Sequence, residues 1–308
     1  MIVVLNKNSG GGTALEKWNS IYRKLNLNGS TETFIVGRNG SVDKFIIDSV
    51  ENGKTDFVIA GGDGSINYFL NRCIDLLEQE TLKQIKLGAV GIGSSNDFHK
   101  PFYQENITEN IPYKLNFKEA VNRDVGCILY ECEGKILKKY FLINASVGIT
   151  AEGNNFFNHP NFILRFLKKM STQTAIIYTI LKNILTYKNF KIKMEVNNES
   201  LTTNVSNLGI IKSPFFTGKL RYQSDPLLNN GLFDVHLSSS LSKIKLLKLF
   251  YKLSKNKSDC SLNKKFWRTN RIKISSERQF AVEFDGEVIT TKYAEFSVIP
   301  ELIKVCTN

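Results

Sequence analysis

Short apolar runs alternate with helical patterns through the first third of the chain. Such runs lie at 2–6, 33–36, 57–60 and 86–92, and each leads into a turn rich in glycine or asparagine. Between them apolar residues recur at helical spacing, as in the pattern of 66–77. Short apolar strands that alternate with helices are typical of a parallel sheet with both faces covered. We therefore predict an N-terminal α/β domain.

The pattern changes near residue 125. The apolar runs that follow, such as "FKIKMEV", "LFDVHL" and "QFAVEFDGEV", are β-type and bounded by turns. Two helical stretches interrupt them, around 162–187 and around 241–253. We predict a second domain that is mainly antiparallel β.

Charge and composition narrow the functional classes. The 308 residues include 41 Lys and Arg against 29 Asp and Glu, a formal net charge of +12 that suits an anionic partner. The 5 cysteines form no CxxC pair and the 3 histidines have no zinc spacing, which favours a reducing interior and disfavours a histidine-bound metal. The N-terminus lacks a signal-peptide pattern, and the apolar segment 174–187 is too short to span a bilayer. We expect a cytoplasmic protein that can touch a membrane from one side.

Three glycine-rich turns follow predicted strands of the first domain: "NKNSGGG", "GGDGSIN" and "GIGSSNDF". Ligands of open α/β sheets bind at the carboxyl ends of the strands, where glycine turns and helix N-termini hold phosphates. One such turn alone is weak evidence, but three at one edge are stronger. Neither a P-loop nor a full GxGxxG pattern is present. Asp63, inside a glycine turn, would repel a phosphate unless a cation or a transferable proton lies between them.

The order of motifs resembles the diacylglycerol kinase catalytic family, which includes soluble bacterial lipid kinases and sphingosine kinases. The resemblance rests on "GGDGSIN", "GIGSSNDF" about 30 residues later and "FDGE" near the C-terminus, with "NKNSGGG", "NRDVG" and "FLINASVGITAE" in the family's order. Lys7 replaces a proline that is usual in the first motif. "GGDG" alone also occurs in NAD kinases and phosphofructokinases.

The resemblance implies a fold like that of NAD kinase and diacylglycerol kinase. An α/β nucleotide-binding domain with a parallel sheet would span 1–124, with the C-terminal segment 301–308 returning to it. A mainly antiparallel β-sandwich domain for the lipid substrate would span 125–300.

The resemblance also implies an ATP site in the first domain. Asp63 would face the Mg²⁺ that accompanies ATP, through water, and Asp124 would join the same polar network or cap a turn. Asp97 would position the "SSND" turn, or cap a helix. The residues expected to contact ATP are Asn6, Ser9, Gly10, Gly61, Gly62, Asp63, Gly64, Ser65, Asn67 and Ser94.

Asp285 in "FDGE" matches the family's general base. Phosphoryl transfer to an alcohol needs an acceptor for the hydroxyl proton, and Glu287, two residues on, makes a carboxylate pair that suits base and orienting roles. The alternative for Asp285 is an ordinary Asp-Gly hairpin turn.

A second metal site of bacterial members maps to "SDPLLNNGLFDV". There Leu227 and Leu232 would offer carbonyl oxygens, and Asn230 stands where the family has an aspartate. An amide oxygen can bind Mg²⁺ but brings no charge, so affinity should fall. Either Asp225 compensates or the structural metal is absent.

Taken together, these features predict a kinase that uses ATP and Mg²⁺ to phosphorylate a hydroxyl of diacylglycerol or a related membrane lipid. An NAD kinase-like enzyme and a catalytically silent nucleotide- or lipid-binding protein are the alternatives. We expect no nucleic-acid partner, and the sequence leaves open whether the protein forms a homodimer.

The lipid would be reached by transient docking on an anionic membrane surface. The first candidate is the basic helix of 241–257, with one face formed by Ile244, Leu247, Phe250 and Leu253. The alternative is an ordinary surface helix. The next candidates are Arg165, Lys168 and Lys169.

Overall fold

The structure, a computed structural model, forms two compact units. One unit comprises Met1–Val125 with Pro300–Asn308, and the other comprises Gly126–Ile299. Their boundary lies directly beside the position where the sequence pattern changes. The described residues are 1–25, 32–256 and 264–307, so Lys257 at the end of the predicted docking segment and Asn308 lie outside them.

The first unit consists of short strands and helices in alternation. Its strands are β1 (Ile2–Leu5), β2 (Glu32–Ile35), β3 (Asp56–Gly61), β4 (Lys86–Gly91), β5 (Ile107–Thr108) and β6 (Ile111–Lys114). Its helices are α1 (Ala14–Tyr22), α2 (Val42–Glu51), α3 (Asp63–Leu76) and α4 (Gln79–Leu82), with the 3-10 turns η1 (Ser9–Gly12), η2 (Asp97–His99) and η3 (Gln104–Asn106).

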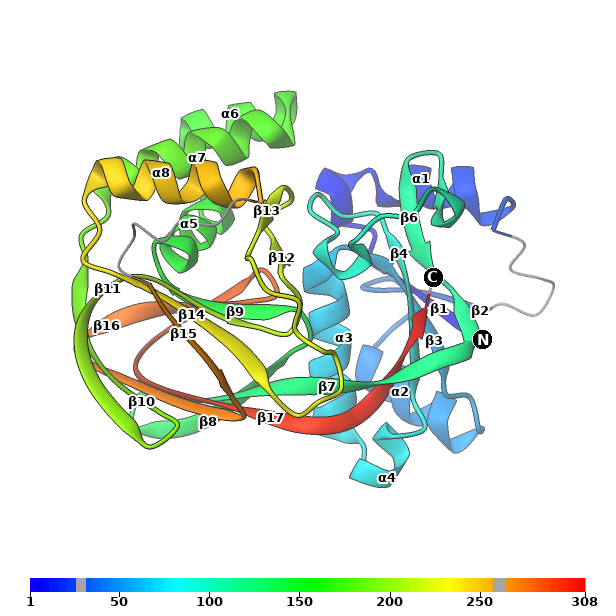
Figure 1. The fold of residues 1–308 in the computed structure, drawn as a ribbon. Coiled ribbons are helices and arrows are strands. Elements are labelled where there is room, and N and C mark those ends of the chain that lie inside the picture. Colours follow the sequence, from blue (N-terminus) through cyan, green and yellow to red (C-terminus); the bar gives the residue numbers. More distant parts are fainter. Residues whose placement is uncertain (26–31, 257–263, 308) are drawn as a thin grey trace. The chain divides into compact units, whose positions relative to one another are not determined.

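The strands at the centre of this unit pair in parallel. β1 pairs in parallel with β2 and with β3, and β3 pairs in parallel with β4. The end of β17 (Glu287–Thr307) pairs in parallel with β4, and β6 pairs with β4 in the antiparallel sense. All residues of β1 are buried, as its uniformly apolar sequence predicts. The carboxyl ends of β1, β3 and β4 therefore lie at one edge of the sheet (Figure 1).

The second unit is built on antiparallel strands. They are β7 (Asn116–Cys132), β8 (Lys135–Phe141), β9 (Asn144–Gly148), β10 (Phe190–Val196), β11 (Glu199–Ile211), β12 (Phe215–Phe216), β13 (Leu220–Arg221), β14 (Phe233–Ser239), β15 (Lys264–Thr269), β16 (Arg271–Phe284) and β17, of which β7 and β17 also reach into the first unit. β11 pairs first with β10 and then with β9, and β16 also pairs with both. The register of β11 shifts between Val205 and Asn207, and that of β16 shifts between Ser275 and Phe280. Each shift lies between the part of the strand that pairs with β10 and the part that pairs with β9, and the strands enclose one apolar core.

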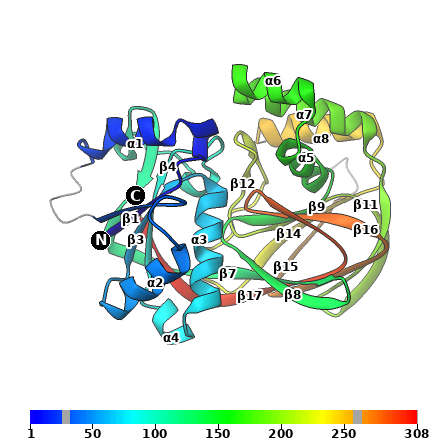
Figure 2. The same ribbon diagram turned by 180° about the vertical axis from the view of Figure 1, so that it is seen from behind.

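Four helices lie on one side of these strands, as both views show: α5 (Ile149–Asn158), α6 (Phe162–Met170), α7 (Thr172–Thr186) and α8 (Lys243–Ser254) (Figures 1 and 2). The stretch predicted at 162–187 is two helices, because Ser171 is extended and its side chain caps α7. In the part of the chain that the structure describes, no helix is long and apolar enough to cross a membrane.

The apolar face of α8 differs from the predicted one. Leu246 and Leu249 are buried together with Phe250 and Leu253, whereas the side chains of Ile244 and Leu247 are 80% and 50% exposed. Positions three apart drift around a helix because one turn takes about 3.6 residues. The predicted face therefore mixed two sides of the helix.

Candidate active site

The first two glycine turns meet through their side chains. Asn6, directly after β1, donates from Nδ2 to the Ser65 hydroxyl at 2.9 Å. The hydroxyl oxygens of Ser9 and Ser65 lie 3.1 Å apart. Both turns follow parallel strands that are direct neighbours, so the sheet itself brings these residues together.

The second and third glycine turns touch through their backbones. The N–H of Ile92 donates to the Gly61 carbonyl at 2.8 Å. A β-carbon on Gly93 would lie 2.4 Å from Gly62 Cα, which no side chain can occupy. Glycine is therefore required here by close approach of the two turns.

Asp63, the first residue of α3, fastens the third turn. Its carboxylate accepts hydrogen bonds from the N–H groups of Asp97 and Phe98, each at 3.0 Å. Asp97 in turn accepts from the Ser95 hydroxyl at 2.8 Å and forms a buried ion pair with Lys100. The two aspartates thus hold the "SSND" turn against the start of α3.

The edge formed by these turns has the features of a phosphate site. Gly62 is the N-cap of α3, and no side chain caps this helix terminus. The positive end of the helix dipole therefore faces the turns. A β-carbon on Gly10 would lie 3.3 Å from Nζ of Lys17, a residue of α1, so a cation lies over the first turn. Sequence reasoning missed Lys17, because only the fold brings α1 back over the turn.

The other predicted residues of the first unit lie in different surroundings. Ser94 is exposed, whereas Asn67 is buried and accepts from Nδ2 of Asn71. Asp124 is fully buried, and its Oδ1 accepts from the N–H of Glu301 at 3.0 Å. This bond fastens the segment of β17 that returns to the first unit.

His99 lies behind the third turn. Burial, together with the charge of Lys114, lowers the pKa of His99 to about 3. Burial also lowers the pKa of Lys114, to about 8. The hidden side of this turn is therefore a region where positive charge is costly.

Asp285 and Gly286 form a two-residue hairpin turn between β16 and β17. Their φ angles are +48° and +92°, and Phe284 pairs with Glu287 across the turn. Positive φ at both positions is typical of a type I′ turn, so the hairpin alternative describes the backbone correctly.

The Asp285 side chain does more than favour the turn. The residue is 5% exposed, and its carboxylate accepts from the N–H groups of Leu142 at 2.7 Å, Ile143 at 2.9 Å and Asn144 at 3.1 Å. Three backbone donors fix the carboxylate in one orientation. A fixed carboxylate suits a group that must meet a reacting hydroxyl in one geometry.

The neighbouring carboxylates divide into a buried and an exposed one. Glu287 is exposed at the start of β17. Glu283 is 4% exposed, accepts from the Gly286 N–H at 2.9 Å and from the Ser146 hydroxyl at 2.7 Å, and so supports the hairpin. Sequence reasoning missed Glu283, although a charged residue in the buried strand "FAVEF" marks it.

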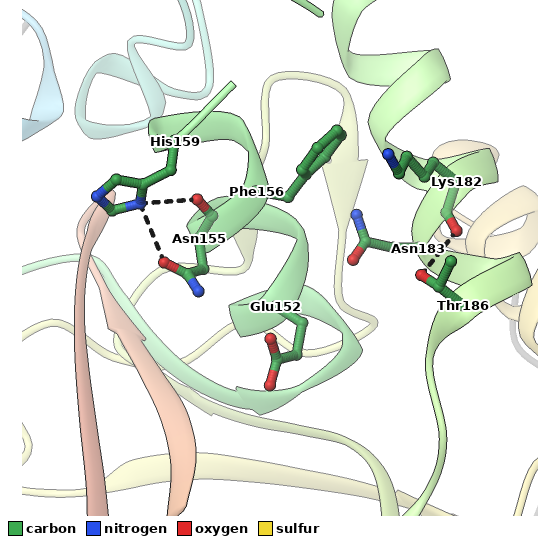
Figure 3. Close-up of a pocket in the computed structure, with 7 residues that line it drawn as sticks. All are labelled: Glu152, Asn155, Phe156, His159, Lys182, Asn183 and Thr186. Atoms are coloured by element: carbon green, nitrogen blue, oxygen red, sulfur yellow. Dashed lines mark hydrogen bonds between the residues drawn. The ribbon is translucent and has the colours of Figure 1, made fainter. Parts of the chain in front are cut away.

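A pocket of about 300 Å³ opens between α5 and α7, beside this hairpin (Figure 3). On one wall, burial raises the pKa of Glu152, and Lys182 from the other wall lies over the Phe156 ring at 4.6 Å. Asn158 at the end of α5 donates to the Gly286 carbonyl at 2.8 Å, which ties the helix to the turn. The pocket is lined by Glu152, Asn155, Phe156, His159, Lys182, Asn183 and Thr186.

The three predicted ligands of a second metal do converge, but on a lysine. Nζ of Lys212 donates to the carbonyls of Leu227 and Leu232 at 2.7 and 2.9 Å and to Oδ1 of Asn230 at 3.1 Å. Asp225 instead pairs with Arg221. An ammonium group at the meeting point repels a cation, so these residues do not fit a metal ion. Among the described residues, no group of three or more His, Cys, Asp or Glu side chains is arranged to bind one.

Comparisons with known proteins agree with this architecture. Residues 1–126 match the model of the diacylglycerol kinase catalytic domain, and residues 145–307 match that of the YegS C-terminal NAD kinase beta sandwich-like domain. Among curated proteins, none matches the chain.

Solved structures share the fold at low sequence identity. A "putative diacylglycerol kinase" from Bacillus anthracis str. Sterne is 16% identical with a TM-score of 0.72, covering 100% of this chain and 94% of that one. A diacylglycerol kinase from the same organism is 14% identical with a TM-score of 0.68, covering 100% and 96%. The two domain models follow each other along nearly the whole chain, which therefore belongs to the family that joins a diacylglycerol kinase catalytic domain to a YegS-type C-terminal domain.

Proposed function

We propose that this protein is a lipid kinase that transfers the γ-phosphoryl group of ATP to a hydroxyl of diacylglycerol or a related membrane lipid. The observation that carries the proposal is the meeting of three glycine turns at one sheet edge, in a chain of this family. A second unit with a fixed carboxylate and a pocket beside it adds the parts that an acceptor needs.

The nucleotide phosphates fit the first unit. The turns around Gly10, Gly62 and Gly93 leave backbone without side chains, and the uncapped start of α3 adds partial positive charge. Lys17 supplies a cation above the first turn. Magnesium would supply charge neutralisation of the triphosphate, and Asp63 is the carboxylate that would face it through water.

The acceptor would be activated in the second unit. Asp285 would take the proton of the lipid hydroxyl as that oxygen bonds to the γ-phosphorus, while the bond to the β-phosphate oxygen breaks and ADP leaves. Glu283 and Asn158 hold the turn that carries Asp285. The pocket between α5 and α7, which combines polar and aromatic residues, would receive the head region of the acceptor.

A transfer assay tests the proposal directly. Purified protein is incubated with γ-labelled ATP and MgCl₂, and with diacylglycerol, other lipid alcohols in mixed micelles, or NAD as acceptor. We expect label in a lipid product. Label in NADP would establish the NAD kinase-like alternative, and binding of ATP with no labelled product from any acceptor would establish a silent binding protein.

Access to a lipid also needs contact with a membrane, and α6 is the better candidate for it. Only Leu164 of this helix is fully buried, whereas the side chains of Phe162, Phe166 and Met170 are 85%, 58% and 69% exposed. Lys168 and Lys169 lie in its last turn. Exposed aromatic residues beside lysines are typical of helices that lie at an anionic lipid surface.

The same helix layer gives a matched comparison with α8. Replacement of Phe162 and Phe166 together by Ser should reduce binding to vesicles that contain anionic lipid, and raised salt should reduce the parent's binding as well. Replacement of Lys245, Lys248 and Lys252 of α8 by Gln should have a smaller effect. If the α6 variant binds vesicles as well as the parent while the α8 variant does not, the docking helix is α8.

A further inference from the structure

The connection between β13 and β14 forms a small cage of oxygen atoms. Two carbonyls, from Leu227 and Leu232, and the side-chain oxygen of Asn230 point to one place. Asn230 Oδ1 also accepts from the Leu232 N–H at 3.1 Å, which holds the loop in this shape. Neutral oxygens that converge in this way favour a hard cation.

The cation in this cage is part of the chain. Lys212 directly follows β11, and its side chain is fully buried although lysine is almost never so. Its contacts with these three oxygens, at 2.7 to 3.1 Å, are hydrogen-bond distances, as an ammonium group makes them. Magnesium and calcium would need oxygens at about 2.0–2.6 Å, without an ammonium among them.

Asn230 offers the Lys212 cation a neutral oxygen, so the cage holds the ammonium group with no aspartate at position 230.

The cage is linked to the candidate base through one residue. The Ile143 carbonyl accepts from the N–H groups of Lys212 and Ser213 at 3.0 and 2.9 Å. The N–H of the same Ile143 donates to Asp285 Oδ1 at 2.9 Å. The segment that positions the Asp285 carboxylate is thus bonded to the segment that the cage anchors.

We propose that Lys212 is a built-in cation that replaces a divalent metal ion at the Leu227–Asn230–Leu232 site. The ammonium group is covalently part of the chain and cannot dissociate. The conformation of the connection between β13 and β14 therefore does not depend on free magnesium or calcium. Lys212 acts as a positioning residue, and a divalent ion is needed only with the nucleotide. The identity of Lys212 as the cation and the independence of the loop from free metal ions do not rest on kinase activity.

Thermal melting without nucleotide tests the proposal. The parent should melt at the same temperature in EDTA and in millimolar MgCl₂ or CaCl₂. The double variant Lys212→Ala with Asn230→Asp vacates the cage and supplies the carboxylate. It should melt lower than the parent in EDTA and recover by roughly 5 °C or more when the ion is added, because the ion binds only the folded state.

Three controls isolate the cage. Lys219→Ala removes an exposed lysine directly before β13, outside the cage, and should leave the melting temperature unchanged in every buffer. Lys212→Met removes the charge and its three hydrogen bonds but keeps a side chain of similar length, and should lower the melting temperature equally with and without ions. Asn230→Asp alone should stay insensitive to the ion, because the ammonium still fills the cage.

Either of two results would overturn the proposal. One is a double variant that is as stable as the parent in EDTA, or that is destabilised and gains nothing from any ion. The other comes from the parent itself, which remains informative if the double variant does not fold. The amount of Mn²⁺ bound, measured by electron paramagnetic resonance, should be the same for the parent and for Asn230→Ala. If Asn230→Ala binds one ion fewer than the parent, a metal lies beside the lysine.

Discussion

Asp63 and Asp285 hold their carboxylates in similar ways in the two units. Each accepts backbone N–H groups from a segment distant in sequence: Asp63 from residues 97 and 98, Asp285 from residues 142 to 144. Asp63 begins a long helix and is half-buried, whereas Asp285 is buried in a hairpin turn at positive φ. Both were predicted from motifs that imply chemistry.

The difference shows how structural and chemical roles can be separated. Asp63 fixes one glycine turn against another, and this role explains the residue without any ligand. A helix N-terminus is an ordinary place for such a carboxylate. The type I′ turn accounts for the backbone of Asp285 but not for its buried carboxylate, which three backbone N–H groups fix in one orientation. The comparison therefore assigns stability first to Asp63 and chemistry first to Asp285.

The strongest test of this division is Asp285→Asn. If Asp285 accepts the hydroxyl proton, kcat should fall roughly 10²-fold or more with little change in ATP affinity. Glu287→Gln, which changes an exposed carboxylate two residues on, should cost much less. Labelled-phosphate transfer and a melting curve for each variant provide the measurement. Near-normal turnover by a folded Asp285→Asn protein would remove the assignment.

Asp63→Ala should act mainly on the first unit. Loss of two charge-assisted hydrogen bonds to the third turn should destabilise the unit by about 2–3 kcal/mol. Calorimetry can follow the unfolding transition, and titration of activity with MgCl₂ adds the chemical readout. An unchanged transition with a raised magnesium requirement would instead make Asp63 chiefly a metal-facing group and reverse the comparison.

Acidic pH should weaken the same turn. His99 follows the residues that donate to Asp63, and its pKa is lowered from an ordinary 6.5 to about 3. The unfolded chain therefore binds a proton more readily, and stability is lost as the pH falls from about 6.5 toward 3. Between pH 7 and pH 5 the loss should reach about 2 kcal/mol.

Replacement of His99 separates its effect from that of the second unit. Burial also lowers the pKa of His236, to about 4, so the second unit has a pH dependence of the same sign. His99→Leu should flatten the pH dependence of the first unit's unfolding and leave that of the second. Parallel slopes for parent and variant would show that His99 does not titrate as described.

Motif order identified the family because its glycine turns are contiguous in sequence. The partners of those turns were not readable in the same way. Asp63 bonds to residues more than thirty positions away, and only the pairing of β3 with β4 brings them close. The motif predicted a metal-facing role for Asp63, which stays a prediction. It did not predict the bonds to Asp97 and Phe98, since a chain without coordinates does not show which N–H groups lie nearby.

Helix α5 and Lys212 were missed for different physical reasons. The segment of α5, "ITAEGNNFFN", contains glycine and asparagines of low helix propensity, and burial of Ile149 and Ala151 stabilises it instead. Lys212 resembles an ordinary lysine at a strand end. Its partners, 15 to 20 residues away, form the cage only after the loop has folded back.

The path of β17 has a consequence for how the chain is made. This strand runs through the second unit, and its last residues, with Leu302 and Val305 buried, pair with β4 in the first. A ribosome releases residues 1–125 early, but the strand beside Lys86 and Leu87 is translated only after the second unit. The first unit is thus completed only after the second has been synthesised. During translation one side of β4 lacks its neighbour, and an unpaired strand edge is open to wrong partners.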